Sequence, residues 1–460
     1  MVNAVAKYQK YAEYKESGVE WLGEIPSHWD GVPCRSVVEH IVEKNTNNSS
    51  DNYLSLMANI GVIRYEDKGD IGNKKPEDLS KCKIVKKGQL VINSMNYSIG
   101  SFGMSSYDGI CSPVYIVLQS KINVYLERFA LRVFENSSFQ KYLAKFGNGI
   151  LEHRSAINWD DIKDKYIPLP SLKEQKSILL FLDYETAKID SLIEKQQKLI
   201  ELLKEKRQAV ISHAVTKGLN PNVSMKDSGV EWLGQVPEHW KIAPIKRIIH
   251  VMEQGKSPEC ENIPATSEQW GVLKTSCVNN GIFHPQQNKA LPEHIKPHTK
   301  YQVKAGDILM SRASGSINLI GSVALVPNEV QENLLLSDKV FRIHLTKDCD
   351  SRFFTLLMAT PYMRTLIERA ISGAEGMANN ITKTAILEFV SAIPPLKEQV
   401  ELVNYLTQKI QAFDSLVVKA CKAIEVMQER RTALISAAVT GKIDVRNWQN
   451  PTEAKMEFSA

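Results

Sequence analysis

One long stretch of this chain occurs twice, and the repeat limits the possible folds more than any other feature. Residues 170–218 begin PSLKEQ, and residues 394–442 begin PPLKEQ. The copies align at an offset of 224 residues, with no gap from Pro170/Pro394 to Thr216/Thr440. A chain of 460 residues with such a repeat is best interpreted as a tandem duplication, with at least two domains.

Each copy predicts a single long helix. Ser171 and Glu174 form the S-x-x-E pattern of a capping box, in which hydroxyl and carboxylate satisfy free amides of the first turn. In the second copy Pro395 replaces the serine, and proline suits a first helical turn. Gly218 and Gly441 mark the ends, because glycine tolerates a left-handed C-cap. About 45 uninterrupted residues predict a rod of roughly 65–70 Å.

Apolar residues recur every seven positions along both predicted helices, as in a coiled-coil seam. In the first copy the seam comprises Leu182, Ile189, Leu203 and Val210, with Ile193 and Leu199 beside it. In the second copy it comprises Leu406, Phe413, Met427 and Leu434, with Val417 and Ile424 beside it. Gln196 is also at a seam position, where a buried polar residue can fix the register or a solvated one can fray. We expect the two copies to pair with each other; the alternative, each helix packing on its own domain, would favour a wider apolar stripe.

A second repeat precedes each globular part. We call residues 14–29 and 225–240 the tryptophan segments, because both contain SGVEWLG and end in Pro-x-His-Trp. The offset grows from 211 residues here to 224 at the helices, so the second half carries two modest insertions. Runs such as QLVIN, PVYIVLQ, DILMS, GSVALV and KVFRIHL predict strands, whereas ERFALRVFENSSFQKYLAKF and SRFFTLLMATPYMRTLIERA predict amphipathic helices.

The predicted fold class is therefore α+β, with two tandem globular domains of one fold separated by two long helices. The expected order along the chain is an N-terminal extension (1–13), a first domain (14–169), a first helix (170–218), a second domain that begins with a short linker (219–393), a second helix (394–442) and a loose polar tail (443–460).

Composition is that of an ordinary globular protein, with 43% hydrophobic and 24% charged residues. The net charge of +5 is a weak indication of an anionic partner. The seven cysteines form no Cys-x-x-Cys pattern and no Cys/His cluster, which indicates reduced thiols rather than disulfides or zinc. No apolar run approaches the length of a membrane span, and the N-terminus lacks the apolar core of a signal peptide. We expect a cytoplasmic protein.

No familiar catalytic motif is present in the sequence. Residues 255–257, Gly-Lys-Ser, resemble the end of a Walker A loop, but His250 stands where that loop requires its first glycine. His294 and His298 are four residues apart, but Pro297 lies between them, so we expect surface histidines rather than a metal pair. The expectation is a chain with no catalytic residue and no metal, whose chemistry belongs to a partner.

Polar loops follow matched strands in the two halves and suggest nucleic-acid recognition. Residues 92–103 match 310–321, and residues 152–159 match 377–383. Arginine can read guanine, asparagine can read adenine, and Ser, Thr and Lys can hold phosphates. The alternative is that these are ordinary surface turns. The candidate DNA-binding residues are Asn93, Ser94, Asn96, Tyr97, Ser98, Arg154, Ser155, Asn158, Lys274, Thr275, Arg312, Ser314, Ser316, Asn380 and Lys383.

The P-x-L-K-E-Q helix starts and the tryptophan segments closely resemble those of one family, the specificity subunits of type I restriction–modification enzymes. The resemblance covers nearly the whole chain, and Pro395 in place of a capping serine is a small departure from it. It implies two target-recognition domains that each read half of an interrupted DNA site. It also implies two helices that pair antiparallel, set the spacing between half-sites, and dock two methyltransferase subunits.

Motor/endonuclease subunits are the further partners that the resemblance implies. S-adenosylmethionine, ATP and Mg are then expected in partner subunits, with no cofactor in this chain. Antiparallel pairing agrees with symmetry, because two copies related by a two-fold axis perpendicular to their length must run in opposite directions. Two alternatives remain open: a pseudo-symmetric scaffold that binds proteins without DNA specificity, and a free-standing enzyme such as a nuclease.

Overall fold

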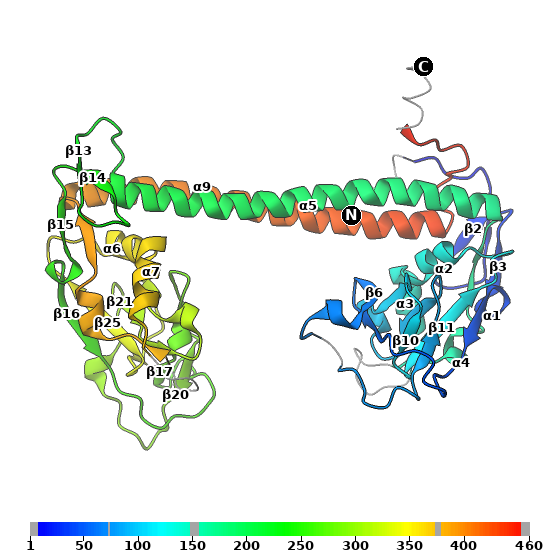
Figure 1. Ribbon diagram of the computed structural model, residues 1–460, viewed down its shortest axis with the longest axis horizontal. Helices are drawn as coiled ribbons and strands as arrows, with labels where there is room; N and C mark the ends of the chain where they lie inside the picture. The colour runs from blue at the N-terminus through cyan, green and yellow to red at the C-terminus, as the bar shows by residue number, and fades with distance from the viewer. Residues whose placement is uncertain (1–7, 72–73, 148–155, 373–378, 452–460) are drawn as a thin grey trace. The chain divides into compact units, whose positions relative to one another are not determined.

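The computed structural model describes residues 8–71, 74–147, 156–372 and 379–451. These residues form two compact units of mixed helix and strand (Figure 1), which confirms the α+β class. Unit 1 comprises Met1–Gln197 and Cys421–Ala460, and unit 2 comprises Lys198–Ala420. Each unit thus contains one globular part and one half of each long helix.

The two long helices are α5 (Leu172–Lys217) and α9 (Leu396–Val439). Gly218 and Gly441 lie just beyond their C-terminal ends with φ of 77° and 73°, in the left-handed region. Both predicted helices and their glycine ends are therefore confirmed.

Buried and half-buried positions on both helices are spaced by three and four residues, as in a coiled coil. On α5 they include Leu182, Ile189, Ile193, Gln196, Ile200, Leu203 and Val210; on α9 they include Leu406, Ile410, Phe413, Val417, Ala420, Ile424, Met427 and Leu434. The predicted seam is confirmed with one exception. Leu199 is 43% exposed, and Ile200 takes its place, because a step of seven from Ile193 reaches residue 200.

The helices pair antiparallel within each unit. In unit 1 Leu182 and Ile189 share a hydrophobic core with Leu434, near the C-terminal end of α9. In unit 2 Ile211, near the C-terminal end of α5, shares a core with Leu406, near the start of α9. The N-terminal half of each helix therefore packs on the C-terminal half of the other.

Two ion pairs repeat this arrangement across the seam. Asp190 Oδ1 lies 2.9 Å from Arg431 Nε in unit 1, and Asp414 Oδ1 lies 3.4 Å from Arg207 Nε in unit 2. The two aspartates are 224 residues apart, and so are the two arginines. The same contact is thus made twice with the helices exchanged, as two-fold pseudo-symmetry requires.

The globular part of unit 1 is built around the antiparallel sheet β4-β11-β8-β9 (Val38–Ile41, Tyr115–Ser120, Leu90–Asn93, Phe102–Met104). Four strand pairs surround it: β1-β2 (Tyr14–Glu16, Glu24–Pro26), β3-β12 (Asp30–Pro33, Tyr166–Leu169), β5-β6 (Leu54–Met57, Gly61–Arg64) and β7-β10 (Lys83–Val85, Gly109–Cys111). Its short helices are α1 (Cys34–Val37), α2 (Glu127–Phe134), α3 (Ser137–Ala144) and α4 (Trp159–Ile162).

Unit 2 repeats this plan around the sheet β16-β25-β21-β23 (Ile249–Gln254, Val340–Leu345, Ile308–Ser311, Val323–Leu325). The smaller sheets are β13-β14 (Met225–Asp227, Gln235–Pro237), β15-β27 (Lys241–Pro244, Val390–Ile393), β18-β19 (Val278–Asn279, Ile282–Phe283), β22-β26 (Ala313–Ser314, Asn379–Asn380) and β20-β17-β24 (Asn288–Ala290, Gly271–Leu273, Leu334–Leu335). Its short helices are α6 (Ser351–Met358), α7 (Pro361–Ala370) and α8 (Lys383–Leu387).

Each central sheet separates two hydrophobic cores, because successive side chains of a strand point to opposite faces. On β8, Leu90 and Ile92 join the core that contains α2 and α3, whereas Val91 joins the core of β5. On β21, Ile308 and Met310 join the core of α6 and α7, whereas Leu309 joins a separate core. The predicted strands are confirmed.

Each predicted amphipathic helix is in fact two short helices. In unit 1 the first helix ends at Phe134, and Asn136 caps α3, since its side chain accepts from Ser138 N and Phe139 N. In unit 2 the break comes at Pro361, which occupies the first turn of α7. Both residues favour a new helix start over continuation.

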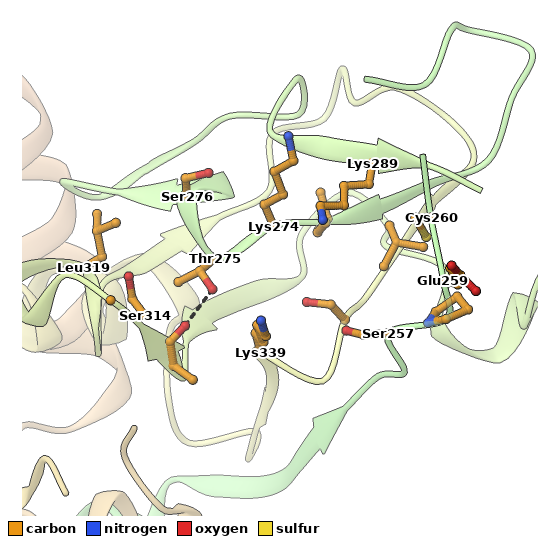
Figure 2. A pocket seen from close by; sticks show the side chains of 16 residues that line it. Ser257, Glu259, Cys260, Lys274, Thr275, Ser276, Lys289, Ser314, Leu319 and Lys339 are labelled. Atoms are coloured by element: carbon orange, nitrogen blue, oxygen red, sulfur yellow. Dashed lines mark hydrogen bonds between the residues drawn. The ribbon is translucent and has the colours of Figure 1, made fainter. Parts of the chain in front are cut away.

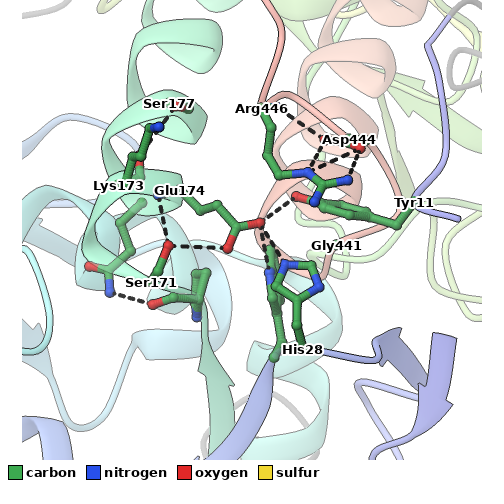
Figure 3. A network of polar contacts seen from close by, with 12 residues as sticks. Tyr11, His28, Ser171, Lys173, Glu174, Ser177, Gly441, Asp444 and Arg446 are labelled. Atoms are coloured by element: carbon green, nitrogen blue, oxygen red, sulfur yellow. Dashed lines mark hydrogen bonds and ion pairs between the residues drawn. The ribbon is translucent and has the colours of Figure 1, made fainter. Parts of the chain in front are cut away.

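The tryptophan segment and the helix start contact each other directly (Figure 3). In unit 1 the carboxylate of Glu174 accepts from the indole of Trp29 at 3.1 Å and lies 2.9 Å from His28 Nε2. In unit 2 Glu398 has the same two partners, Trp240 at 3.0 Å and His239 at 2.8 Å. The two repeated motifs of the sequence are therefore two sides of one structural junction.

The predicted capping box is only half right. Glu174 N donates to Ser171 Oγ at 3.3 Å, as expected, but the Glu174 carboxylate binds the Ser171 hydroxyl and the tryptophan segment. The following glutamine anchors the helix start to the α2 side of the domain. Gln175 accepts from Leu126 N and donates to Val124 O, at 2.8 and 2.9 Å.

The described segments nearest the two termini, residues 8–13 and 443–448, are packed in unit 1 rather than loose. Tyr11 is buried and its hydroxyl donates to Glu174 at 3.3 Å. Ile443 and Val445 are buried in the same core, and Asp444 N donates to Gln9 O at 2.8 Å. The expectation of a loose polar tail is therefore wrong for residues 443–448, because alternating apolar residues pack against the N-terminal segment.

Candidate nucleic-acid interface

The two matched polar loops meet at the same place in each unit. In unit 1 Ile157 N donates to Ser94 O at 3.0 Å, and in unit 2 Ile381 N donates to Arg312 O at 3.0 Å. These donors and acceptors are aligned residues of the two halves. In unit 2 the contact continues as the pairing of β22 with β26. Loops that are far apart in the sequence thus form one surface in each unit.

Arg312 and Lys383 lie beside the ring of Phe341 in unit 2. The guanidinium carbon of Arg312 is 5.9 Å from the ring centre, and Lys383 Nζ is 5.7 Å from it. Arg312 Nη1 donates to Asp338 O at 3.1 Å, and Lys383 Nζ donates to Met252 O at 2.8 Å. Within the described chain no other hydrogen bond holds the Arg312 guanidinium, so it retains donors for a base edge or a phosphate.

A pocket of about 580 Å³ lies next to this loop in unit 2 (Figure 2). It is lined by three lysines, Lys274, Lys289 and Lys339, and we call it the lysine pocket. The other lining residues are Ser257, Pro258, Glu259, Cys260, Val272, Leu273, Thr275, Ser276, Ala313, Ser314, Gly315, Leu319 and Ser337. The structure therefore brings together the predicted Lys274, Thr275 and Ser314 and adds two lysines that sequence reasoning missed.

Strand register explains why the lysines converge. Val272 of β17 is the direct partner of Lys289 on β20, so the two side chains share a face of the ribbon. Lys274 is two residues beyond Val272 and belongs to the same face. Lys339 comes from a third segment, just before β25. No contiguous motif joins these lysines, which is why the sequence did not reveal them.

Hydrogen bonds and close packing hold the pocket walls. Thr275 Oγ1 donates to Ala313 O at 2.7 Å, and the Ser257 hydroxyl donates to the Asp338 carboxylate. A Cβ on Gly255 would lie 1.7 Å from Leu336 O, so only glycine allows this approach of the two backbones. Of the Gly-Lys-Ser tripeptide, Ser257 lines the pocket, and Gly255 allows the close packing of two backbones rather than forming a Walker loop.

In unit 1 the corresponding region has a different character. Asn93, Asn96 and Ser101 line a smaller pocket together with Tyr53 and Lys68. Asn93 is buried and accepts from Met95 N at 3.1 Å, whereas Asn96 is exposed. Lys68 is buried, and its ammonium group donates to Ile71 O at 2.6 Å.

Two predicted contacts of unit 1 have structural roles. Tyr97 is 3% exposed and its hydroxyl donates to Phe134 O at 2.6 Å; burial raises the pKa of this phenol well above its ordinary value. Asn158 caps α4, accepting from Asp160 N and Asp161 N at 2.8 and 3.2 Å. The burial of Tyr97 corrects its assignment, whereas Asn158 is exposed and its contact with DNA stays a prediction. Arg154 and Ser155 lie outside the described residues, as does the side chain of Ser98.

The remaining candidates lie on the loop surface of unit 2. Ser314 and Asn380 are half-buried in the β22-β26 pair, and Ser316 is exposed, with its backbone N–H donating to Ser314 Oγ at 3.1 Å. These candidates remain predictions.

The part of the chain that the structure describes has neither a cluster of metal ligands nor a membrane-spanning helix. It contains no group of three or more His, Cys, Asp and Glu side chains that could hold a metal ion, and His294 and His298 are both exposed. Among its helices, none combines the length and apolar character needed to cross a membrane.

The family described as the type I restriction modification DNA specificity domain matches residues 26–202 and 237–424. The chain belongs to this family. It carries the domain twice, and each match runs from a tryptophan segment into a long helix. The duplication, the paired helices and the meeting polar loops are thus features of a member of the type I specificity family.

Named relatives agree with this assignment. The chain is 24% identical to the type I restriction enzyme MjaVIII specificity subunit of Methanocaldococcus jannaschii, over 94% of this chain and 98% of the relative. It is 27% identical to the EcoEI specificity subunit of Escherichia coli, over 54% of this chain. That alignment spans 41% of the EcoEI subunit, and the one with the EcoKI specificity subunit of Escherichia coli spans 61%.

Solved structures share the fold. A chain from a structural study of complex assembly and conformational transition in a type I R-M system aligns with a TM-score of 0.60 at 15% identity, covering 90% of this chain and 98% of that one. The HsdS subunit of Thermoanaerobacter tengcongensis aligns with a TM-score of 0.51 at 15% identity, covering 91% and 98%.

Proposed function

We propose that this chain is the DNA-recognition subunit of a type I restriction–modification complex, in which each unit reads one half of a bipartite, asymmetric site. The observation that carries the proposal is the repeated contact between polar loops, Ile157 with Ser94 and Ile381 with Arg312, in two domains of the matched family. The loops themselves differ in sequence, so the two half-sites should differ as well.

The available side chains fit the chemistry of base reading. Arg312 can donate to O6 and N7 of guanine, and the exposed amide of Asn96 can pair with N6 and N7 of adenine. A good bidentate pair discriminates against the wrong base by about 1–3 kcal/mol. Arg312→Gln should therefore relax one position of the half-site read by unit 2.

Two methyltransferase subunits are the partners that we propose for the long helices. Leu192 and Leu202 of α5 are exposed, and so are their counterparts 224 residues later, Leu416 and Val426 of α9. Exposed apolar residues repeated in this way offer the same surface twice, which suits two copies of one partner. Motor/endonuclease subunits would join for cleavage, and S-adenosylmethionine, ATP and Mg would bind to the partners. This chain then contributes the DNA sequence specificity of the complex and no catalytic group.

The test is methylome sequencing of a host that expresses this chain with its cognate methyltransferase subunit, compared with a host that lacks this chain. Methylated adenines in one bipartite motif with a constant gap are the expected result. A soluble complex that produces no motif would exclude DNA specificity and favour the protein-binding scaffold.

A further inference from the structure

We propose that the lysine pocket of unit 2 binds backbone phosphate of the DNA and provides much of the salt-dependent affinity, whereas the pocket of unit 1 does not bind phosphate. This inference rests on the proposed function and deepens it. It assigns phosphate binding to only one of two domains that share one fold.

The charge of the lysine pocket suits an anion. Lys274, Lys289 and Lys339 line one pocket, and none of them forms an ion pair with a described carboxylate. Glu259 is the only acidic residue among the described residues that line it. Three ammonium groups around one pocket repel one another, and an anion that enters the pocket relieves this repulsion. A phosphodiester is the anion that DNA offers at every step of its backbone.

Hydrogen-bond donors around the lysines also suit a phosphate. Ser314 and Ser337 line the same pocket, and in the described chain neither hydroxyl donates to another group, so both can donate to an anion. The hydroxyls of Ser257, Thr275 and Ser276, by contrast, already donate to protein acceptors. Hydroxyls and lysines are the side chains that commonly contact phosphate oxygens. Among the described residues that line the pocket there is no amide to pair with adenine and no guanidinium group to pair with guanine.

Hydrogen bonds hold the backbone next to Lys289 in place. Asn288, which precedes Lys289, is fully buried; its amide accepts from Ala265 N at 2.8 Å and donates to Pro285 O at 2.7 Å. Gly255 packs directly on Leu336, and these residues precede Ser257 and Ser337 of the lining by two positions and one position. A site whose backbone is already ordered loses less entropy when it binds.

Unit 1 provides an internal comparison. The lysine that lines its pocket, Lys68, is buried and donates to the carbonyls of Gly69 and Ile71 at 3.4 and 2.6 Å. Its ammonium group also lies 4.8 Å from the ring centre of Tyr65. With that charge already bound by protein groups, the pocket of unit 1 presents amides and hydroxyls and suits base edges.

The experiment uses the assembled complex of this chain with its methyltransferase subunits. DNA affinity is measured at several salt concentrations for the wild type, for the triple variant Lys274→Gln/Lys289→Gln/Lys339→Gln, and for the corresponding triple Lys→Arg variant. Lys246→Gln is the matched control, since Lys246 is outside the pocket and pairs with Glu388 at 2.7 Å. Thermal unfolding of each complex checks that the fold is retained.

Each lost phosphate contact should reduce the slope of log K against log salt by about 0.9. We expect the slope of the Gln triple variant to fall by one to three times this amount. Its affinity should fall equally for all DNA sequences, and the methylated motif should be unchanged. The Arg triple variant and Lys246→Gln should keep the wild-type slope.

Two results would overturn the inference while leaving the proposed function intact. One is an unchanged slope in the Gln triple variant, even if the pocket binds inorganic phosphate. The other is relaxation of a single motif position, which would make a lysine a base reader. Absence of any motif for the wild-type complex would instead contradict the proposed function itself.

Discussion

The indole N–H of Trp29 donates a hydrogen bond of 3.1 Å to the carboxylate of Glu174, and this contact joins the tryptophan segment to the start of α5. Trp29 is fully buried, so its N–H has no access to water. Trp240 and Glu398 repeat the contact at 3.0 Å in unit 2. The most similar parts of the two halves are thus the parts that attach each domain to its helix, and not the parts that would read DNA.

Removing the Glu174 carboxylate should destabilise unit 1 and leave the stability of unit 2 unchanged. Glu174→Ala leaves the Trp29 indole and the Tyr11 hydroxyl without their carboxylate partner, at a cost of about 1–3 kcal/mol for each unsatisfied buried group. Hydrogen-exchange mass spectrometry should show faster exchange in peptides of unit 1 and wild-type exchange in unit 2.

Glu398→Ala should produce the reverse pattern, and the exposed Glu401→Ala should change neither unit. Equal exchange in the wild type and Glu174→Ala would show that the junction does not stabilise unit 1.

The same carboxylate predicts a pH dependence of stability. Burial alone would raise the pKa of Glu174, but hydrogen bonds from His28 and Trp29 outweigh burial, and the pKa lies below its ordinary value of 4.5. A depressed folded-state pKa stabilises the fold above the unfolded-state value, and that contribution is lost as the pH falls through the folded-state value. The stability difference between wild type and Glu174→Gln should therefore be constant above about pH 5 and shrink on acidification. Urea unfolding of unit 1 between pH 7 and pH 3 measures it; a difference that grows as the pH falls would contradict the assignment.

The seam of α5 can be tested with two neighbouring leucines. Leu182 is 0% exposed and shares a core with Leu434 of α9, whereas Leu180 is 64% exposed on the same helix. Leu182→Ala should destabilise unit 1 by about 2–5 kcal/mol, as expected for a large-to-small change in a core. Leu180→Ala should change stability by less than about 0.5 kcal/mol, as surface substitutions usually do. Denaturant unfolding distinguishes them, and similar losses for both would show that the coiled-coil register is wrong.

Tyr97 and Asn96 are adjacent, and the structure separates their roles. Tyr97→Phe removes the bond to Phe134 O and should cost about 1 kcal/mol of stability, with the methylated motif unchanged. Asn96→Ala should leave stability near the wild-type value, since Asn96 is exposed, and should relax one position in the half-site of unit 1. Motif relaxation by Tyr97→Phe would restore this tyrosine as a base reader.

Much of the fold follows from periodicity in the sequence. Seven-residue spacing predicts the seam of α5 and α9, and short β-branched runs between turn residues predict strands at β8 and β21. Gly218 and Gly441 predict the helix ends through their backbone freedom. These are local properties, and local properties can be read from one sequence.

Other features depend on contacts between distant residues, and the sequence did not reveal them. The burial of Tyr97 depends on α2, and the packing of Ile443 and Val445 depends on the N-terminal segment. Lys289 and Lys339 can be recognised as candidate ligands only in the folded chain. Strand register places Lys289 on the same face as Lys274, and Lys339 lines the same pocket from a third segment. Glu174 was assigned to a capping box because the local pattern fits one, but its carboxylate binds Trp29, which is 145 residues earlier.

The most direct test of the account is a domain exchange read out by methylome sequencing. Residues 225–393 are replaced by the second recognition domain of another family member, and residues 14–169 are exchanged in a parallel chimera. The account predicts that each chimera changes one half of the methylated motif and leaves the other half as in the wild type. A chimera that assembles and methylates, but changes both halves or neither, would contradict the central claim that each unit reads its own half-site.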